Sequence, residues 1–410
     1  MSERYFFLIL GNAPLLGRLK TTAVPSIFTW KKDPDATLAC KRTNRAHNRE
    51  ERKRKFAEMC KEELEASFYE EIDIGEVTVP VDEQKEEQVH DEEPHSKKMK
   101  MVDAMNQTIT QPIYSLEQFQ NDPSAIHFYS GLESFAKFML VLHSLGPAAS
   151  CLTYIYFQVQ GVSIENQLFM TLMKLRRYTP NFELSRFFGI SEATVKNIVY
   201  TWILFMARQW REIDIWPTQN LVRYFAPSDF KAKFPTTRCI IDGTECPIKK
   251  PSAPRAQQAT FSTYKNRNTV KALIGSTPGG LVNYISPAYG GSTSDRQIVE
   301  RSNLVSICDP GDSIMADKGF NVQDLFATKN VSINIPSFFK KKNRMHGNIV
   351  LNDRKVSSKR VHIERIIGLG KTYKILVNPL TSTETKLSSD ILFVCFMLCN
   401  FRSCIVSKDA

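Results

Sequence analysis

From about residue 236 onward, short apolar runs punctuated by glycine and proline alternate with helical segments, and this texture restricts the possible folds more than any other feature. Five runs predict strands, at residues 239–244, 270–277, 281–287, 314–319 and 331–335. Helices are expected at 296–303, between the third and fourth strands, and at 361–368, after the fifth. Strands that alternate with helices in this way predict an α/β domain.

Carboxylates stand at the ends of two of these predicted strands. The order of three strands, a helix, two strands and a helix is typical of a ribonuclease H-like mixed five-stranded sheet flanked by helices. In that fold the first and fourth strands are neighbours, so Asp242 and Asp317 should converge. Asp295 and Glu364 would join them from the flanking helices.

A cluster of acids at one place in a fold predicts a cation site, because magnesium and manganese prefer oxygen ligands. The candidate metal ligands are Asp242, Asp295, Asp317 and Glu364. Three of them also have structural interpretations. Asp295 could cap a helix, and Asp317 could be a turn residue. Glu364 could pair with Arg360 or Lys359.

The preceding segment, 113–215, has helical periodicity and contains a predicted helix-turn-helix at 166–210. A short helix at 182–188 is followed by a glycine-containing turn and a long helix at 192–210. In a helix-turn-helix the first residues of the second helix face the DNA groove. The candidate DNA-reading residues are therefore Ser191, Glu192, Thr194 and Lys196. A helical hairpin whose apolar face is only core is the alternative.

Charge is distributed unevenly along the chain. The net charge is +11, but residues 62–95 hold fourteen acidic residues and one lysine, so the rest of the chain carries +24. We expect 1–60 to be basic and irregular and 61–112 to be an acidic, disordered linker. A body this basic favours a polyanion such as DNA as its partner.

Nine cysteines without a regular framework favour reduced thiols in an intracellular protein. The apolar run 391–401 is shorter than the ~20 residues that span a bilayer, so a buried C-terminal helix is expected, with Cys395 and Cys399 in the core. No membrane association is expected. Basic clusters at 49–55 and 97–100 favour the nucleus, although each could also be a solvated charge run.

Five motifs resemble those of DDE superfamily endonucleases of the PIF/Harbinger transposase type. They are IDGTECPI at 241–248, YKNRNTVK at 264–271, GGSTSDR at 290–296, ADKGF at 316–320 and RVHIER at 360–365. The resemblance covers about 236–402, within a predicted endonuclease domain at 236–405. The segment 166–210 is similar to the helix-turn-helix that often accompanies this domain.

The resemblance implies a transposase-derived endonuclease that hydrolyses and joins DNA strands with Mg²⁺ or Mn²⁺. The catalytic residues it implies are Asp242, Asp317 and Glu364, with Asp295 as an additional metal ligand. Basic residues near the site would then bind phosphates, and they are Lys265, Arg267, Lys271, Lys340, Lys341, Lys342, Arg344 and His346. The family also suggests a separate DNA-binding partner protein; a homo-oligomer is a further expectation.

The N-terminal segment 19–28 resembles the end of a THAP zinc finger, which implies that 1–60 is a truncated remnant. Zinc is not expected, because residues 1–22 contain neither cysteine nor histidine and so lack the finger's ligands. Loss of the finger favours an alternative function, a catalytically silent DNA-binding protein derived from a transposase. A scaffold for protein partners is a third hypothesis.

Overall fold

The computed structural model describes residues 114–336 and 347–406. The expected basic segment 1–60, the acidic linker 61–112 and the THAP-like remnant lie outside the described residues. So do five of the predicted phosphate-binding residues, which are Lys340, Lys341, Lys342, Arg344 and His346.

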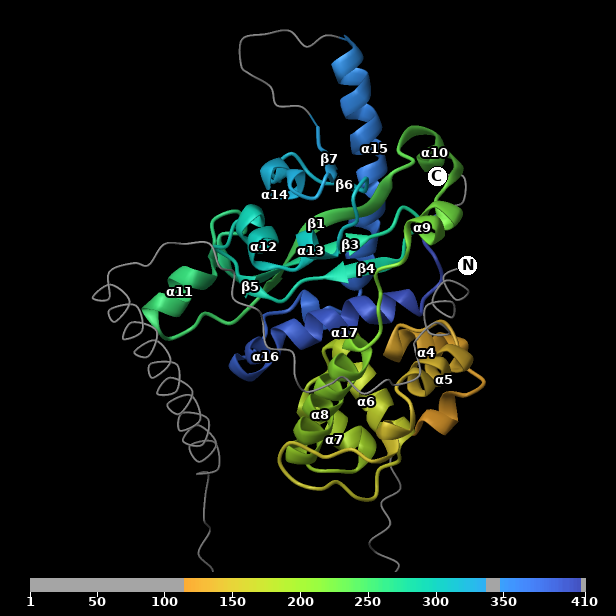
Figure 1. Cartoon of the computed structure of the whole chain (residues 1–410). Helices are drawn as coiled ribbons and strands as arrows, with labels where there is room; N and C mark the ends of the chain where they lie inside the picture. The colour runs from red at the N-terminus through yellow and green to blue at the C-terminus, as the bar shows by residue number, and fades with distance from the viewer. Residues whose placement is uncertain (1–113, 337–346, 407–410) are drawn as a thin grey trace, which may run out of the picture. The chain divides into compact units, whose positions relative to one another are not determined.

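The first part of the described chain is helical, as predicted (Figure 1). Its elements are η1 (Leu116–Phe119), α4 (Pro123–Ser130), α5 (Phe135–Ser144), η2 (Pro147–Ser150), α6 (Ile164–Arg177), α7 (Asn181–Phe188), α8 (Glu192–Arg211), α9 (Gln219–Phe225) and α10 (Ser228–Lys233). Helix α7 ends at Gly189, whose φ of 64° lies in the left-handed region that glycine adopts without strain. Ser191 then caps α8, so a helix, a turn and a helix occur where the sequence predicts them.

The second part contains a mixed sheet. Its strands are β1 (Thr237–Pro247), β2 (Phe261–Ser262), β3 (Arg267–Ser276), β4 (Val282–Ile285), β5 (Tyr289–Gly290), β6 (Ser313–Met315) and β7 (Ser332–Asn334). The order is β2-β3-β1-β6-β7, and β4 and β5 also pair with β3. Strand β3 is antiparallel to its neighbours, whereas β1, β6 and β7 run parallel. The mixed α/β fold is confirmed, and the first and fourth predicted strands, β1 and β6, are neighbours as expected.

Two details of the predicted sheet are wrong. Within the described residues the sheet has seven strands instead of five, because the two-residue strands β2 and β5 also pair with β3. The first strand does not end in a turn at Asp242 and Gly243 but continues to Pro247. Its pairing with β3 includes Gly243 opposite Leu273, so the glycine belongs to the ladder.

Helices cover both faces of the sheet (Figure 1). Helices α12 (Asp295–Arg301), α13 (Leu304–Ile307) and α14 (Gln323–Ala327) cover one face, and α15 (Gly347–Gly370) and α17 (Ser388–Asn400) cover the other. The smaller elements are α11 (Pro254–Thr260), η3 (Lys374–Leu376) and α16 (Ser382–Lys386). Successive strand residues point to opposite faces, so Ile241 packs toward α12 while Ile240 packs toward α15 and α17.

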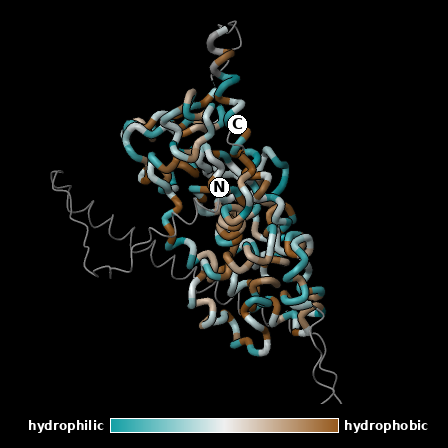
Figure 2. Tube along the Cα trace, turned by 90° about the vertical axis from the view of Figure 1, so that its right-hand side faces the viewer, coloured by the Kyte–Doolittle hydropathy of each residue, from teal (hydrophilic) through white to brown (hydrophobic). Residues whose placement is uncertain are grey.

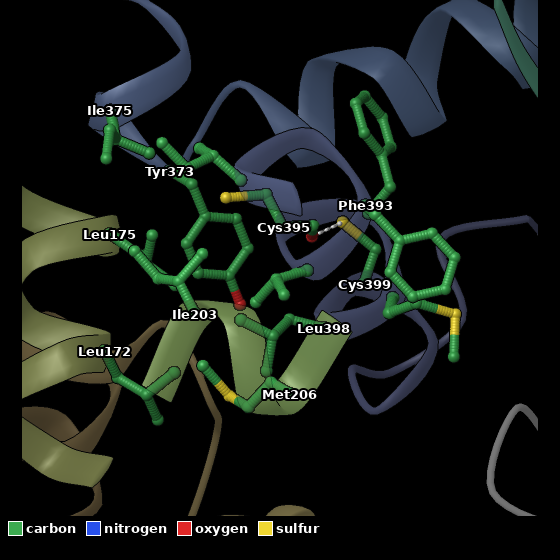
Figure 3. Close-up of a cluster of buried hydrophobic side chains, with 14 of the residues drawn as sticks. Leu172, Leu175, Ile203, Met206, Tyr373, Ile375, Phe393, Cys395, Leu398 and Cys399 are labelled. Carbon is green, nitrogen blue, oxygen red and sulfur yellow. Dashed lines mark hydrogen bonds between the residues drawn. The ribbon is translucent and has the colours of Figure 1, made fainter. Parts of the chain in front are cut away.

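Helix α17 joins the helical part to the sheet, because it contacts both β4 and α8. Figure 3 shows Cys395, Leu398 and Cys399 of this helix beside Tyr373, Ile203 and Met206. The Cys399 thiol donates a hydrogen bond to the carbonyl of Cys395, 3.3 Å away. The buried C-terminal helix and the core position of its two cysteines are therefore confirmed.

Apolar and polar stretches alternate along the described chain (Figure 2). Among the described helices, none combines the length and the hydrophobicity needed to cross a membrane.

Candidate active site

Asp242 lies in the middle of β1, on the face of the sheet that carries α15. Its Oδ1 accepts a hydrogen bond of 2.8 Å from the backbone N–H of Gly243. Burial raises the pKa of Asp242 to about 6, and the negative charges of Asp317 and Asp295 add to the increase. The Gly243 N–H and the Arg360 guanidinium oppose it. A carboxyl group in this state binds a proton readily and would gain from a cation beside it.

The parallel pairing of β1 with β6 brings Asp317 beside Asp242. Ile240 is paired with Met315. Asp242 lies two residues after Ile240, and Asp317 lies two residues after Met315. Asp317 follows the end of β6, and its backbone carbonyl accepts a turn hydrogen bond from Phe320, 3.0 Å away. The residue is therefore in a turn, as one interpretation expected, and its carboxylate also faces the candidate site.

Arg360 of α15 lies between two of the acids. Its Nη1 lies 2.8 Å from Asp317 Oδ1, and its Nη2 lies 3.9 Å from Glu364 Oε1. Glu364 is one helical turn further along and 57 % exposed. Of the two partners that the sequence offered for Glu364, Arg360 is thus the nearby one, because Lys359 pairs with Asp229 instead at 2.6 Å.

Asp295 starts α12, on the opposite face of the sheet. Ser294 caps this helix in a reciprocal arrangement with Gln297, so the interpretation of Asp295 as the N-cap is wrong. The Asp295 carboxylate lies 2.7 Å from Lys271 Nζ. Its buried Oδ1 lacks an aligned hydrogen bond, so the contact with Lys271 is an ion pair.

Gly243 allows this pair to lie directly on β1. A Cβ at this position would stand 3.1 Å from Asp295 Oδ1 and 3.2 Å from Lys271 Cε. The glycine therefore favours the close approach of the two side chains and does not form a turn. Lys271, predicted to bind phosphate, forms an ion pair with Asp295 and neutralises it.

The acids are compensated by side chains in this structure. No group of three His, Cys, Asp or Glu residues within 114–336 and 347–406 is arranged to hold a metal ion. The donor chemistry nevertheless fits Mg²⁺ or Mn²⁺, because carboxylate oxygens are available from β1, from the end of β6 and from α15. The raised pKa of Asp242 agrees with this fit, because a cation beside the carboxyl group would favour its charged form. An ion held by Asp317 would compete with the Arg360 guanidinium for this carboxylate.

Two further acids of the sheet region have structural roles. Glu245 accepts a hydrogen bond of 2.9 Å from Thr269 Oγ1. Asp312 is buried against the guanidinium of Arg238, at 3.2 Å, and accepts a hydrogen bond from Gln219. The sequence suggests Arg360 only as a partner of Glu364, and its shorter contact with Asp317 was not predicted. No local signal indicates that contact, because it depends on the packing of α15 against the end of β6.

In the helix-turn-helix, the predicted DNA-reading residues lie at the start of α8. Ser191 and Glu192 are exposed, and Thr194 and Lys196 are half-buried. Ser191 Oγ accepts a hydrogen bond from the backbone N–H of Thr194, 3.1 Å away. The next residue, Asn197, is fully buried and bonds to the backbone of Tyr156 and Phe157, which ties the loop before α6 to α8.

Two further predicted phosphate ligands lie close to the turn between β2 and β3. Lys265 is in the turn, and Arg267 is the first residue of β3. Lys265 and Arg267 are both exposed. Between β2 and Lys265 stands Tyr264, which is 83 % exposed, and the Lys265 ammonium lies 4.5 Å from the centre of its ring. Basic groups beside an exposed ring suit a nucleic acid, because the basic groups bind phosphates and the aromatic ring stacks on bases.

Comparison with known proteins agrees with this geometry. Residues 241–400 match the family model described as DDE superfamily endonuclease, and this range includes all four candidate acids. Residues 160–211, which contain α6, α7 and α8, match the model described as helix-turn-helix of DDE superfamily endonuclease. No curated protein matches the chain. The two family matches show a DDE superfamily endonuclease domain, preceded in the same chain by the helix-turn-helix domain of that superfamily.

Proposed function

We propose that this chain is a transposase-derived endonuclease of the PIF/Harbinger type, which hydrolyses DNA phosphodiesters and transfers strands with Mg²⁺ or Mn²⁺. The observation that carries the proposal is the convergence of Asp242 and Asp317 at adjacent parallel strands, with Glu364 held near them through Arg360. The order of the main strands, β4-β3-β1-β6-β7, supports a ribonuclease H-like arrangement of the sheet.

Asp242, Asp317 and Glu364 would hold the metal, and Asp295 is a further ligand candidate from the opposite face of the sheet. When bound between carboxylates, divalent ions activate water and stabilise the leaving oxygen of a phosphodiester. The protein's own contribution is to supply deprotonated carboxylates and to position the DNA. Asp242 must lose its proton before it can act as a ligand.

The surrounding basic residues would position the DNA backbone without reading sequence. Lys265 and Arg267 suit this task because both are exposed beside Tyr264. The helix-turn-helix would contact bases through the residues at the start of α8, which are Ser191, Glu192, Thr194 and Lys196. We further propose that the protein acts in the nucleus and forms a homo-oligomer. It would work with a separate DNA-binding partner protein, and its N-terminus would derive from a THAP zinc finger.

A catalytically silent DNA-binding protein is the second candidate function. The ion pair between Arg360 and Asp317 favours it, because this pair neutralises a ligand that catalysis requires.

Incubation with labelled DNA and Mn²⁺ separates the two functions. We expect the wild-type chain to nick or join the DNA and Asp242→Ala to be inactive. Glu245→Gln is the matched control, because Glu245 lies on the same strand but bonds to Thr269. Cleavage that is equal in the wild type and Asp242→Ala would refute catalysis at this site. Metal-independent DNA binding without any cleavage would establish the silent function.

A further inference from the structure

A second basic region lies apart from the acidic centre, which Asp242, Asp317 and Glu364 form. An open cavity of about 950 Å³ is formed between α4, the end of α6 and the segment that follows α15. Its lining includes Phe128, Arg176, Arg177, Lys371 and Lys374. Its volume falls in the range of ~300–1,000 Å³ that is usual for ligand sites, so a short stretch of a flexible ligand fits better than a duplex.

The charges around this cavity are unbalanced. Four of its lining residues are cations, and Glu133 is the acid among them. Glu133 already forms an ion pair of 2.7 Å with Lys137 and accepts a hydrogen bond from the backbone of Ser403. Among the residues that the structure describes, Arg177, Lys371 and Lys374 have no ion-pair partner. An anionic ligand would supply the missing negative charge.

The cavity also presents an aromatic surface. Phe128 is 47 % exposed, and the guanidinium of Arg177 lies 3.9 Å from the centre of its ring. Guanidinium groups and aromatic rings both offer flat surfaces on which nucleic-acid bases stack. Such stacking is open to an unpaired base, whereas the bases of a duplex are already stacked on one another.

Helix α15 connects this cavity with the acidic centre. Val361, Glu364, Arg365 and Gly368 are exposed at a spacing of three and four residues, which places them along one side of the helix. Lys371 follows the helix seven residues after Glu364, about 10 Å further at ~1.5 Å per residue. Apart from the adjacent residues and the backbone of its own helix, nothing lies within 4 Å of the place where a Cβ of Gly368 would stand, so the surface at Gly368 is open.

We propose that the cavity binds a single strand of DNA that extends from the phosphodiester at the acidic centre. Lys371 and Lys374 bind its phosphates, and Phe128 with Arg177 stacks on an unpaired base. This site deepens the proposed nuclease function and rests on it for the identity of the ligand. It gives the enzyme a place for the strand that separates from its complement beside the cut.

Fluorescence anisotropy of the full chain tests the site without catalysis. The probes are a fluorescein-labelled single-stranded oligodeoxynucleotide and the duplex of the same sequence, both in EDTA and over a range of salt concentrations. We expect Phe128→Ala to weaken single-strand binding on the order of 10-fold, because a stack is lost, with an unchanged salt slope. The double variant Lys371→Ala/Lys374→Ala should reduce the slope by about 1.4, because each phosphate contact contributes roughly 0.7. Lys329→Ala, which removes an exposed lysine near α14, is the control and should bind like the wild type.

The outcomes separate this site from the nuclease function. Single-strand binding that is unchanged in both cavity variants, with cleavage by the wild type intact, would overturn the cavity site alone. An equal loss of duplex binding would overturn its selectivity for a single strand. Loss of single-strand binding in the variants, together with no cleavage by the wild type, would support the cavity and reject the nuclease.

Discussion

The guanidinium of Arg360 lies 2.8 Å from the carboxylate of Asp317 and thereby ties α15 to the end of β6. The same side chain lies 3.9 Å from Glu364, and its buried Nε has no hydrogen-bond partner. Arg360 therefore provides positive charge between two of the carboxylates that would hold a divalent ion. An ion held by Asp317 would compete with this guanidinium for the carboxylate.

Removing the arginine should improve metal binding. We expect Arg360→Ala to bind Mn²⁺ about three- to tenfold more tightly than the wild type, because a half-exposed ion pair of roughly 1 kcal/mol no longer has to be broken. Isothermal titration of the DNA-free protein measures this affinity. Arg365→Ala removes an exposed charge from the same helix and should have a smaller effect. Weaker Mn²⁺ binding by Arg360→Ala would show that the guanidinium supports the site and does not compete with the ion.

Metal binding should also depend on pH through Asp242. Its pKa is raised to about 6, chiefly by burial, so the group is largely protonated below pH 6 and charged above it. The apparent affinity for Mn²⁺ should therefore rise about tenfold per unit up to pH 6 and level off above it. Titrations between pH 5 and 8 would reveal the step, and Asp242→Asn should abolish it. A wild-type affinity that is flat across this range would exclude Asp242 as a ligand.

The approach of Asp242 to Asp317 could be predicted from the sequence, because it depends on strand order. Each acid follows an apolar run, and neighbouring parallel strands carry equivalent positions side by side. The location of Asp295 was harder to predict. Ser294 and Asp295 are both good capping residues, and the selection of Ser294 depends on its reciprocal bond with Gln297.

Lys271 and Arg360 could not be assigned for a different reason. In the sequence both are basic residues in a basic region, and nothing local distinguishes a phosphate ligand from an internal counter-ion. The register of β3 against β1 places Lys271 over Gly243, and the packing of α15 places Arg360 beside Asp317. Both are long-range relationships that arise only in the folded chain.

The raised pKa of Asp242 also predicts an effect on stability. The folded protein holds this proton more tightly than an unfolded chain does, where the pKa is close to 3.8. The contribution of Asp242 to stability is therefore largest at low pH and is lost as the pH rises from about 4 through about 6. Asp242→Asn avoids the buried charge, and we expect it to raise the free energy of unfolding at pH 7.5 by about 1–2 kcal/mol without metal. Urea denaturation in EDTA measures the difference, and Glu245→Gln is the control. A variant no more stable than the wild type at pH 7.5 would contradict the buried charge.

Asn197 should be essential for the loop that precedes α6. Its buried amide donates a hydrogen bond of 2.6 Å to the carbonyl of Phe157 and accepts one of 3.2 Å from the N–H of Tyr156. Asn197→Ala leaves both backbone groups without these partners, which we expect to lower the free energy of unfolding by about 2–3 kcal/mol. Limited proteolysis should also become faster at 151–163, where Tyr156 and Phe157 are exposed. Asn220→Ala, at an exposed position of α9, should leave both measurements unchanged. Wild-type stability and wild-type proteolysis in Asn197→Ala would mean that other contacts hold the loop, such as the hydrogen bond that the Ile155 N–H donates to Thr201 Oγ1.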